Sequence, residues 1–222
     1  MPTVPEMSLR PELRAAAALL ERGSESIRAV TAGEQNRFTR AFEALNRLAL
    51  ANGTQFAIVG GLAAIHFGYP AITEDIAIVV ARDALDRLLA DAPRFGFKVT
   101  WRSNAGWHTL QFEDVEINIV PEGGKARDSA PTTIPGPTNL GVASGLGYSD
   151  LPGWIELKLS AGRAKDRTHI VEVLKSLAPE KISEIRRHVS RVHSRYRKLL
   201  DQLIEEAKEE KRQEGERGRH QE

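Results

Sequence analysis

The sequence predicts an α+β fold in which a mixed sheet is flanked by helices. A short apolar run at Phe56–Val59 is separated from a second one at Asp75–Val80 by a Gly60-Gly61 turn and a small helix. Three more runs between Phe97 and Val120 show the alternation and the short turns of an antiparallel meander. Helical periodicity precedes and follows these strands, which places helices beside the sheet.

Composition favours one main domain and excludes several kinds of site. The chain has 222 residues, 41% of them hydrophobic and 27% charged, which is the balance of a globular protein with one sizeable core. The net charge of +1 gives no global attraction to nucleic acid. The absence of cysteine excludes disulfides, thiolate metal sites and cysteine nucleophiles. No signal-peptide pattern and no apolar run near the ~20 residues of a membrane span is found, so we expect a cytoplasmic protein without membrane association.

The N-terminal part is expected to hold a loose arm and two helices. Residues 1–10 contain two prolines and no periodicity, and Pro11–Glu21 follows as an alanine- and leucine-rich helix with proline in its first turn. Glu34–Ala51 is a stronger amphipathic helix that Asn52-Gly53 ends. We expect residues 11–178 to form one domain that includes these helices.

The strands alternate with short helices. Leu62–Phe67 and Arg82–Ala92 are predicted helices, and the meander strands are predicted at Phe97–Arg102, Trp107–Phe112 and Val115–Val120. Because side chains alternate across a strand, Glu116 and Asn118 share one face, as do Asp75 and Ala77.

Residues 121–146 are rich in glycine, proline, serine and threonine and are predicted to form a long connection with a short strand near Thr132–Ile134. Ser149-Asp150 can cap a helix over Leu151–Gly162. A further helix over Asp166–Leu177 stops before Pro179.

The C-terminal part shows a heptad pattern. Apolar residues recur at steps of three and four, which predicts a heptad-patterned helix over residues 179–204; these are Ile182, Ile185, Val189, Val192, Tyr196, Leu199 and Leu203. This helix either packs on the body or pairs with another copy, and its arginines also allow an RNA- or partner-binding arm. Residues 205–222 have no apolar stripe and are expected to fray as a charged tail.

The double glycine has a chemical meaning. Gly60-Gly61 between a strand and a helix lets the backbone approach a ligand and leaves the first helical amides free for a phosphate. Thr73 and Asp75 follow at the start of the next strand, with Asp75 fourteen residues after Gly61.

Two motifs carry a family resemblance. The double glycine, the Gly68-Tyr69-Pro70 turn and the strand carboxylate resemble the nucleotidyltransferase fold of the DNA polymerase beta superfamily. The segment from Ile155 to Asp166 is similar to the L-K-L-x-A-G-R-x-K-D pattern of small bacterial nucleotidyltransferases related to abortive-infection toxins. The resemblance extends from about Phe56 to Leu177.

The resemblance implies a site for a nucleoside triphosphate with Mg²⁺. Carboxylates on adjacent strands hold two Mg²⁺ ions while a hydroxyl attacks the alpha phosphorus. Carried over by position, Asp75 is the first metal ligand, residue 77 would be the second but is alanine, and either Glu116 or Asn118 occupies the third position.

Further roles follow from the same resemblance. Asp75, Glu116 and Lys158 are the expected catalytic residues, and Asp166 caps a helix and orients its basic neighbours. The residues expected to bind the nucleotide or its phosphates are Gly60, Gly61, Thr73, Arg163 and Lys165.

Three hypotheses follow. In the first, the protein transfers a nucleoside monophosphate to a hydroxyl of an RNA, a protein or a small molecule, a reaction that the missing carboxylate at Ala77 weakens. In the second, it is a catalytically inactive binding or regulatory module related to toxin–antitoxin systems. In the third, it is a structural oligomer, or binds a partner protein, through residues 180–204.

Overall fold

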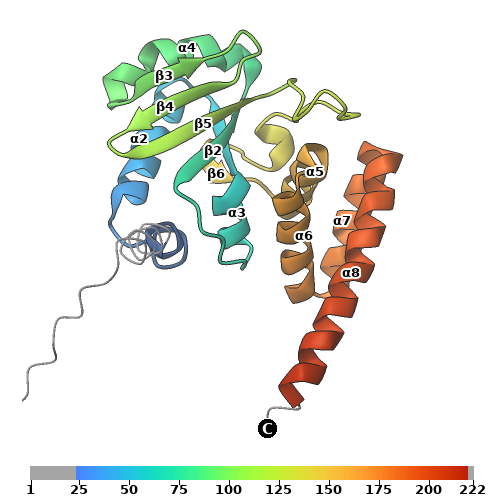
Figure 1. Cartoon of the computed structure of the whole chain (residues 1–222). Helices are drawn as coiled ribbons and strands as arrows, with labels where there is room; N and C mark the ends of the chain where they lie inside the picture. Colours follow the sequence, from blue (N-terminus) through green and yellow to red (C-terminus); the bar gives the residue numbers. More distant parts are fainter. Residues whose placement is uncertain (1–23, 220–222) are drawn as a thin grey trace, which may run out of the picture.

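The computed structural model describes residues 24–219, which build a six-stranded mixed sheet with helices on both faces (Figure 1). The predicted α+β class is therefore confirmed. The arm over 1–10 and the helix predicted over 11–21 lie outside the described residues. The strands are β1 (Gln55–Val59), β2 (Asp75–Val80), β3 (Lys98–Arg102), β4 (His108–Phe112), β5 (Val115–Pro121) and β6 (Gly145–Tyr148).

The strand order β3-β4-β5-β2-β1-β6 places β5 and β2 next to each other at the centre of the sheet. The meander β3-β4-β5 is antiparallel, as predicted, whereas β2 lies parallel to β5 and β1 parallel to β6. In the β2–β5 register Asp75 pairs with Glu116 and Ala77 with Asn118. All four side chains therefore project from one face of the sheet.

The connection over residues 121–146 contains a strand that its composition hides. β6 begins within it and pairs with β1; its sequence Gly-Leu-Gly-Tyr has low strand propensity. The strand predicted at Thr132–Ile134 is not part of the sheet, although Ile134 exchanges backbone hydrogen bonds with Gly123 (2.9 Å) and Gly124 (2.8 Å). A 3-10 turn, η3 (Thr138–Leu140), follows.

One face of the sheet is covered by α2 (Arg37–Ala51) and α4 (Leu85–Asp91), whose apolar residues pack on the strands. The helix predicted from Glu34 begins at Arg37, because Asn36 caps it and exchanges hydrogen bonds with Thr39. The helix predicted over 82–92 is divided into α4 and two flanking 3-10 turns, η1 (Arg82–Ala84) and η2 (Ala92–Phe95).

On the other side lie α3 (Gly60–His66), α5 (Leu151–Ala161) and α6 (Ala164–Ser176). A second, smaller cluster of buried residues joins this face of β1 and β2 to the 121–146 connection. It consists of Ala57, Val59, Val79, Ile134, Leu140 and Val142.

The predicted single heptad helix is wrong, because the chain forms two helices there, α7 (Pro179–Val192) and α8 (Ser194–Arg219). His193 between them is extended, with φ −165° and ψ 137°, and its ring nitrogen accepts the backbone N–H of Arg195 at 3.1 Å. Folding the chain back buries apolar residues of both helices against the body, whereas one straight helix would carry half of the stripe away from it. No glycine or proline marks the break.

The heptad residues therefore pack within the chain. Four of them are buried in the main core, namely Ile185, Val189, Tyr196 and Leu203. Of the predicted alternatives, the structure therefore shows the one in which the heptad residues pack on the body of the protein. Helix α8 continues to Arg219, so residues 205–219 are helical instead of forming a frayed tail. Across residues 24–219 no helix has the length and apolar character needed to cross a bilayer.

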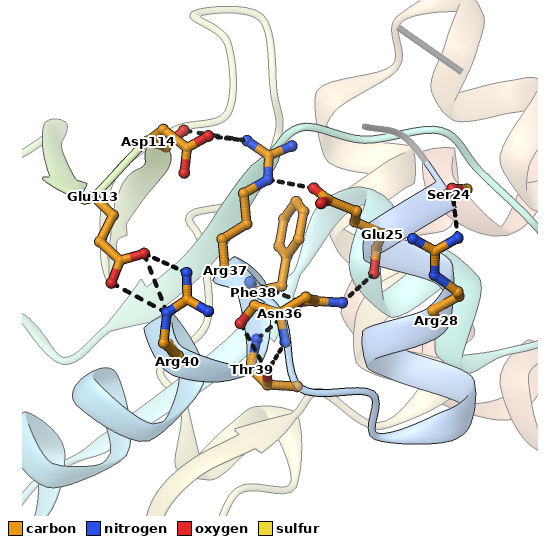
Figure 2. Close-up of polar contacts among 10 residues, drawn as sticks. All are labelled: Ser24, Glu25, Arg28, Asn36, Arg37, Phe38, Thr39, Arg40, Glu113 and Asp114. Atoms are coloured by element: carbon orange, nitrogen blue, oxygen red, sulfur yellow. Dashed lines mark hydrogen bonds and ion pairs between the residues drawn. The ribbon is translucent and has the colours of Figure 1, made fainter. Parts of the chain in front are cut away.

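A polar cluster of Glu25, Arg37 and Asp114 ties the start of α2 to its neighbours (Figure 2). The buried Arg37 guanidinium donates to Glu25 at 2.6 Å and to Asp114 at 3.1 Å. One helical turn later, Arg40 pairs with Glu113 at 2.6 Å, but both of these side chains are exposed. Arg37 thus links the helix over residues 24–32, α2 and the β4–β5 turn.

Replacing Arg37 by alanine is expected to lower the free energy of unfolding by about 1–3 kcal/mol, because a buried guanidinium with two charged partners is lost. Arg40→Ala is the matched control and should cost far less, since an exposed pair contributes little. Urea unfolding followed by circular dichroism measures both. Equal losses would show that Arg37 is no more important than a surface arginine.

Candidate functional site

A cleft of about 670 Å³ opens between the sheet and the α5–α6 pair. Most of the residues that the sequence singled out line this one cleft; they are Gly60, Gly61, Thr73, Asp75, Lys158, Arg163 and Lys165. Glu116 is the exception, because its side chain is exposed and is not part of the cleft wall.

The glycine turn is held in close contact with the neighbouring strand. Gly60 has a φ of 72°, and a Cβ on Gly61 would lie 3.0 Å from the Cβ of Thr73. The Trp154 indole donates to the Gly60 carbonyl at 3.1 Å and fixes the turn from the other side. The two glycines belong to the first turn of α3, which was predicted to start at Leu62, and no side chain caps that turn. Both glycines line the cleft, so the backbone there can come close to a ligand.

The strand wall of the cleft carries one carboxylate. Both oxygens of Asp75 accept hydrogen bonds, one from the Thr73 hydroxyl at 2.7 Å and one from the Asn118 amide nitrogen at 2.9 Å. The same amide nitrogen also donates to Glu116 at 3.1 Å. Of the two candidates for the third position, Asn118 lies opposite Ala77 and lines the cleft, whereas Glu116 lies opposite Asp75.

The donor set does not fit two Mg²⁺ ions. Such ions require oxygen ligands, with carboxylates shared between them. Position 77 offers a methyl group and its partner Asn118 presents N–H groups to both carboxylates, so Asp75 is the one carboxylate of the strand wall that lines the cleft. Throughout residues 24–219, no three histidine, cysteine, aspartate or glutamate side chains are arranged around a common metal position.

The opposite wall is built on a buried carboxylate. Asp166 is fully buried and binds Lys158 at 2.9 Å and Arg163 at 2.7 Å. It also accepts the backbone N–H of Arg163 at 3.2 Å. The helix predicted from Asp166 begins at Ala164, so Asp166 binds the N-cap residue from the third position of α6 and is not itself the cap. Burial alone would raise the pKa of Asp166, but its hydrogen bonds with Arg163 and Lys158 outweigh burial and hold that pKa below its ordinary value. Burial lowers the pKa of Lys158 below its ordinary value, although the negative charge of Asp166 acts in the opposite direction.

His169 completes this wall. Its Nδ1 lies 3.0 Å from the Lys158 ammonium nitrogen, and burial together with the neighbouring lysine charge lowers the pKa of His169 to about 4. At neutral pH the imidazole is therefore uncharged and accepts a hydrogen bond from Lys158. Lys158 is held between a carboxylate and a neutral ring, which fixes its position in the cleft.

Sequence reasoning missed two residues of this cleft, His169 and Arg127. His169 shows no metal-ligand spacing. Arg127 lies in the glycine- and proline-rich connection. The length of this connection is the one sequence feature that suggests a functional role for it. The Arg127 guanidinium lies against Gly162, where any Cβ would come within 2.7 Å of it. Gly162 follows the last residue of α5 with a φ of 61°, a left-handed conformation that favours glycine.

Changing Asp166 to asparagine is expected to lower the free energy of unfolding by about 3 kcal/mol, because the buried Lys158 ammonium loses its counter-charge. Glu184→Gln, in the exposed pair with Lys181, serves as the control and should leave stability unchanged. Thermal and urea unfolding of the three proteins would provide the comparison. A stable Asp166→Asn variant would contradict the importance of this ion pair.

Acidification should weaken the fold through His169. Its folded pKa of about 4 lies below its ordinary 6.5, so between these values the unfolded chain binds the proton and stability falls as the pH is lowered. His169→Gln keeps a hydrogen-bond acceptor but does not titrate, so its stability should depend less on pH in this window. Urea unfolding at several pH values measures the slopes, and an imidazole NMR titration checks the pKa. Parallel slopes would contradict this account.

Comparison with known protein families and with curated protein sequences finds no match. Among solved structures, the chain is similar to the antibiotic-resistance factor ANT(2'')-Ia, whose solution structure was described in terms of substrate-regulated conformation dynamics. The two chains are 12% identical, the alignment covers 84% of this chain and 100% of that one, and the TM-score is 0.41.

Proposed function

We propose that this protein binds a nucleoside triphosphate in the cleft between the sheet and α5–α6, and acts as a nucleotidyltransferase-type binding or regulatory module. The observation that carries the proposal is that one cleft is lined both by a glycine turn and by a cluster of cationic side chains. The uncapped Gly60-Gly61 turn lies on one wall, and four cationic side chains line the other, namely Arg127, Lys158, Arg163 and Lys165.

The charge of the cleft favours a ligand with several phosphate groups. Four cations lie against two carboxylates, Asp75 and Asp166, which leaves a net charge of +2 while His169 is neutral. The backbone of the Gly60-Gly61 turn, which lines the cleft, adds N–H donors for phosphate oxygens. Phosphates bind well to such a combination of guanidinium, ammonium and backbone N–H groups.

The remaining lining has room for a nucleoside. The volume of about 670 Å³ is in the range of small-molecule sites. Apolar and aromatic residues that can pack against a base or a sugar include Val59, Ile72, Trp107, Ile134 and Leu157.

The sequence motifs support the same class of ligand. Gly60-Gly61, the turn at Gly68-Tyr69-Pro70 and the segment from Ile155 to Asp166 resemble nucleotidyltransferases related to abortive-infection toxins. The proposal accordingly extends to a role in a toxin-related system, in which the bound nucleotide serves recognition or regulation. Ala77 and Asn118 are the reason why we favour binding over transfer.

A second candidate is nucleotidyl transfer to a hydroxyl of an RNA, a protein or a small molecule. It is favoured by the register of the central strands, which sets the carboxylates of Asp75 and Glu116 side by side, and by the buried Lys158 in the same cleft. Both candidates require the nucleotide to bind. They differ in whether a phosphate bond is then broken.

Isothermal titration with ATP, CTP, GTP and UTP, each with and without Mg²⁺, tests the proposal. At least one nucleotide should release heat at one site. Gly61→Ala should weaken binding about tenfold or more, because its Cβ would press on Thr73 and displace a phosphate-facing turn. Gly215→Ala, which meets open space on α8, should bind as the wild type does. No heat with any nucleotide would disprove nucleotide binding.

Transfer is tested with nucleotides labelled at the alpha phosphate. The wild-type protein should transfer no label to itself or to added RNA, whereas the double variant Ala77→Asp with Asn118→Asp regains two carboxylates and should gain transfer. Adding Asp75→Asn to that variant should abolish any transfer that was gained. Label transfer by the wild type would instead establish the second candidate.

A further inference from the structure

The Asn118 amide nitrogen lies between the two strand carboxylates and donates to both. Its nitrogen lies 2.9 Å from an Asp75 oxygen and 3.1 Å from a Glu116 oxygen, while its own oxygen accepts the Thr109 hydroxyl at 3.3 Å. This orientation of the amide follows from its partners, because two carboxylates can only accept hydrogen bonds. The two carboxylates are thus bridged by N–H groups and need no metal to lie side by side.

The positive charge of the cleft lies on the opposite wall. Lys158 and Arg163 are both bound to Asp166. Arg127 and Lys165 differ from them, since within residues 24–219 neither the Arg127 Nε nor the Lys165 ammonium has a hydrogen-bond or ion-pair partner. The Nε of Arg127 is buried, and a buried donor without a partner is costly unless a ligand or water satisfies it.

Gly162 places Arg127 in this position. It ends α5 in a left-handed conformation with a φ of 61°, and the guanidinium lies directly over its Cα, where a Cβ would collide with three of its atoms. The arginine is thereby held between the connection and the start of α6, beside Arg163 and Lys165 in the cleft lining. This is an arrangement suited to a phosphate group, which guanidinium binds through parallel N–H donors.

From these contacts we infer that the cleft takes its phosphate ligand without a divalent cation, with Asn118 replacing the metal between the carboxylates and Arg127 and Lys165 supplying the positive charge. The inference rests on the proposed nucleotide binding. It adds the form of the ligand, which is the metal-free triphosphate, and it assigns a binding role to Arg127.

Calorimetry in two buffers tests this form of the ligand. ATP, CTP, GTP, UTP and inorganic tripolyphosphate are titrated into the full-length protein once with EDTA and once with excess Mg²⁺. We expect equal or tighter binding in EDTA, because Mg²⁺ neutralises charge that the cleft would otherwise meet. Binding that requires Mg²⁺ would overturn the inference while leaving the proposed function intact. No binding in either buffer would reject the proposed function itself.

Variants test the two parts separately. Arg127→Gln should weaken binding in EDTA about tenfold or more, since one charge-assisted contact is lost. Arg87→Gln, an exposed arginine of α4 on the other face of the sheet, should have no effect. Equal affinities of the two variants would remove Arg127 from the site.

The role of Asn118 is read from thermal unfolding without nucleotide. The melting temperature of the wild type should not change on addition of Mg²⁺ or Mn²⁺. Asn118→Asp removes the bridging N–H groups and sets three carboxylates together, so its melting temperature should be lower and should rise when either metal is added. A metal-dependent rise in the wild type, or none in the variant, would contradict the replacement.

Discussion

The buried ion pair of Asp166 with Lys158 and Arg163 is the constraint on which the C-terminal half depends. A fully buried carboxylate must be compensated by charge and hydrogen bonds, and its partners come from α5 and from the residue before α6. The pair therefore fixes how these two helices meet. Helices α7 and α8 pack on them in turn, and Lys158 reaches the cleft only because α5 is held in this way. One interaction thus sets both the packing and the charge of the site.

The fold was largely predictable from local signals. Apolar runs, glycine turns and amphipathic periodicity gave the meander, the central strands and most helices, because those patterns follow directly from burial on one face. Strand β6 and the break at His193 are two of the features that the sequence did not predict. Strand β6 has the sequence Gly-Leu-Gly-Tyr, in which glycine lowers the strand propensity, so only its pairing with β1 reveals it. The break at His193 is decided by tertiary packing, since the apolar stripe runs through it without interruption and a continuous helix satisfies the same local pattern.

The site was predictable to the extent that it follows from motifs. The glycine turn, Asp75 and the basic segment after Lys158 lie far apart in the chain and line one cleft, and only the resemblance grouped them beforehand. The alternation of side chains along a strand predicts that Glu116 and Asn118 share one face. It does not predict which of them lines the cleft, because that depends on the parallel register of β2 and β5. The position of Arg127 in the cleft could not be predicted from the sequence, because it depends on the packing of this loop arginine against Gly162.

A metal site presents clustered carboxylates and has an excess of negative charge, whereas an anion site presents cationic groups and has an excess of positive charge. Clustered carboxylates without a cation repel one another, and the alanine at position 77 and the asparagine at position 118 bring no charge to the strand wall of the cleft. The remaining carboxylates are then satisfied by hydrogen bonds, as Asp75 is by Thr73 and Asn118. The cations in the cleft lining outnumber its carboxylates, and a phosphate ligand would complement this excess of positive charge. The uncharged side chains at positions 77 and 118 and the arginine on the loop are therefore parts of one electrostatic arrangement.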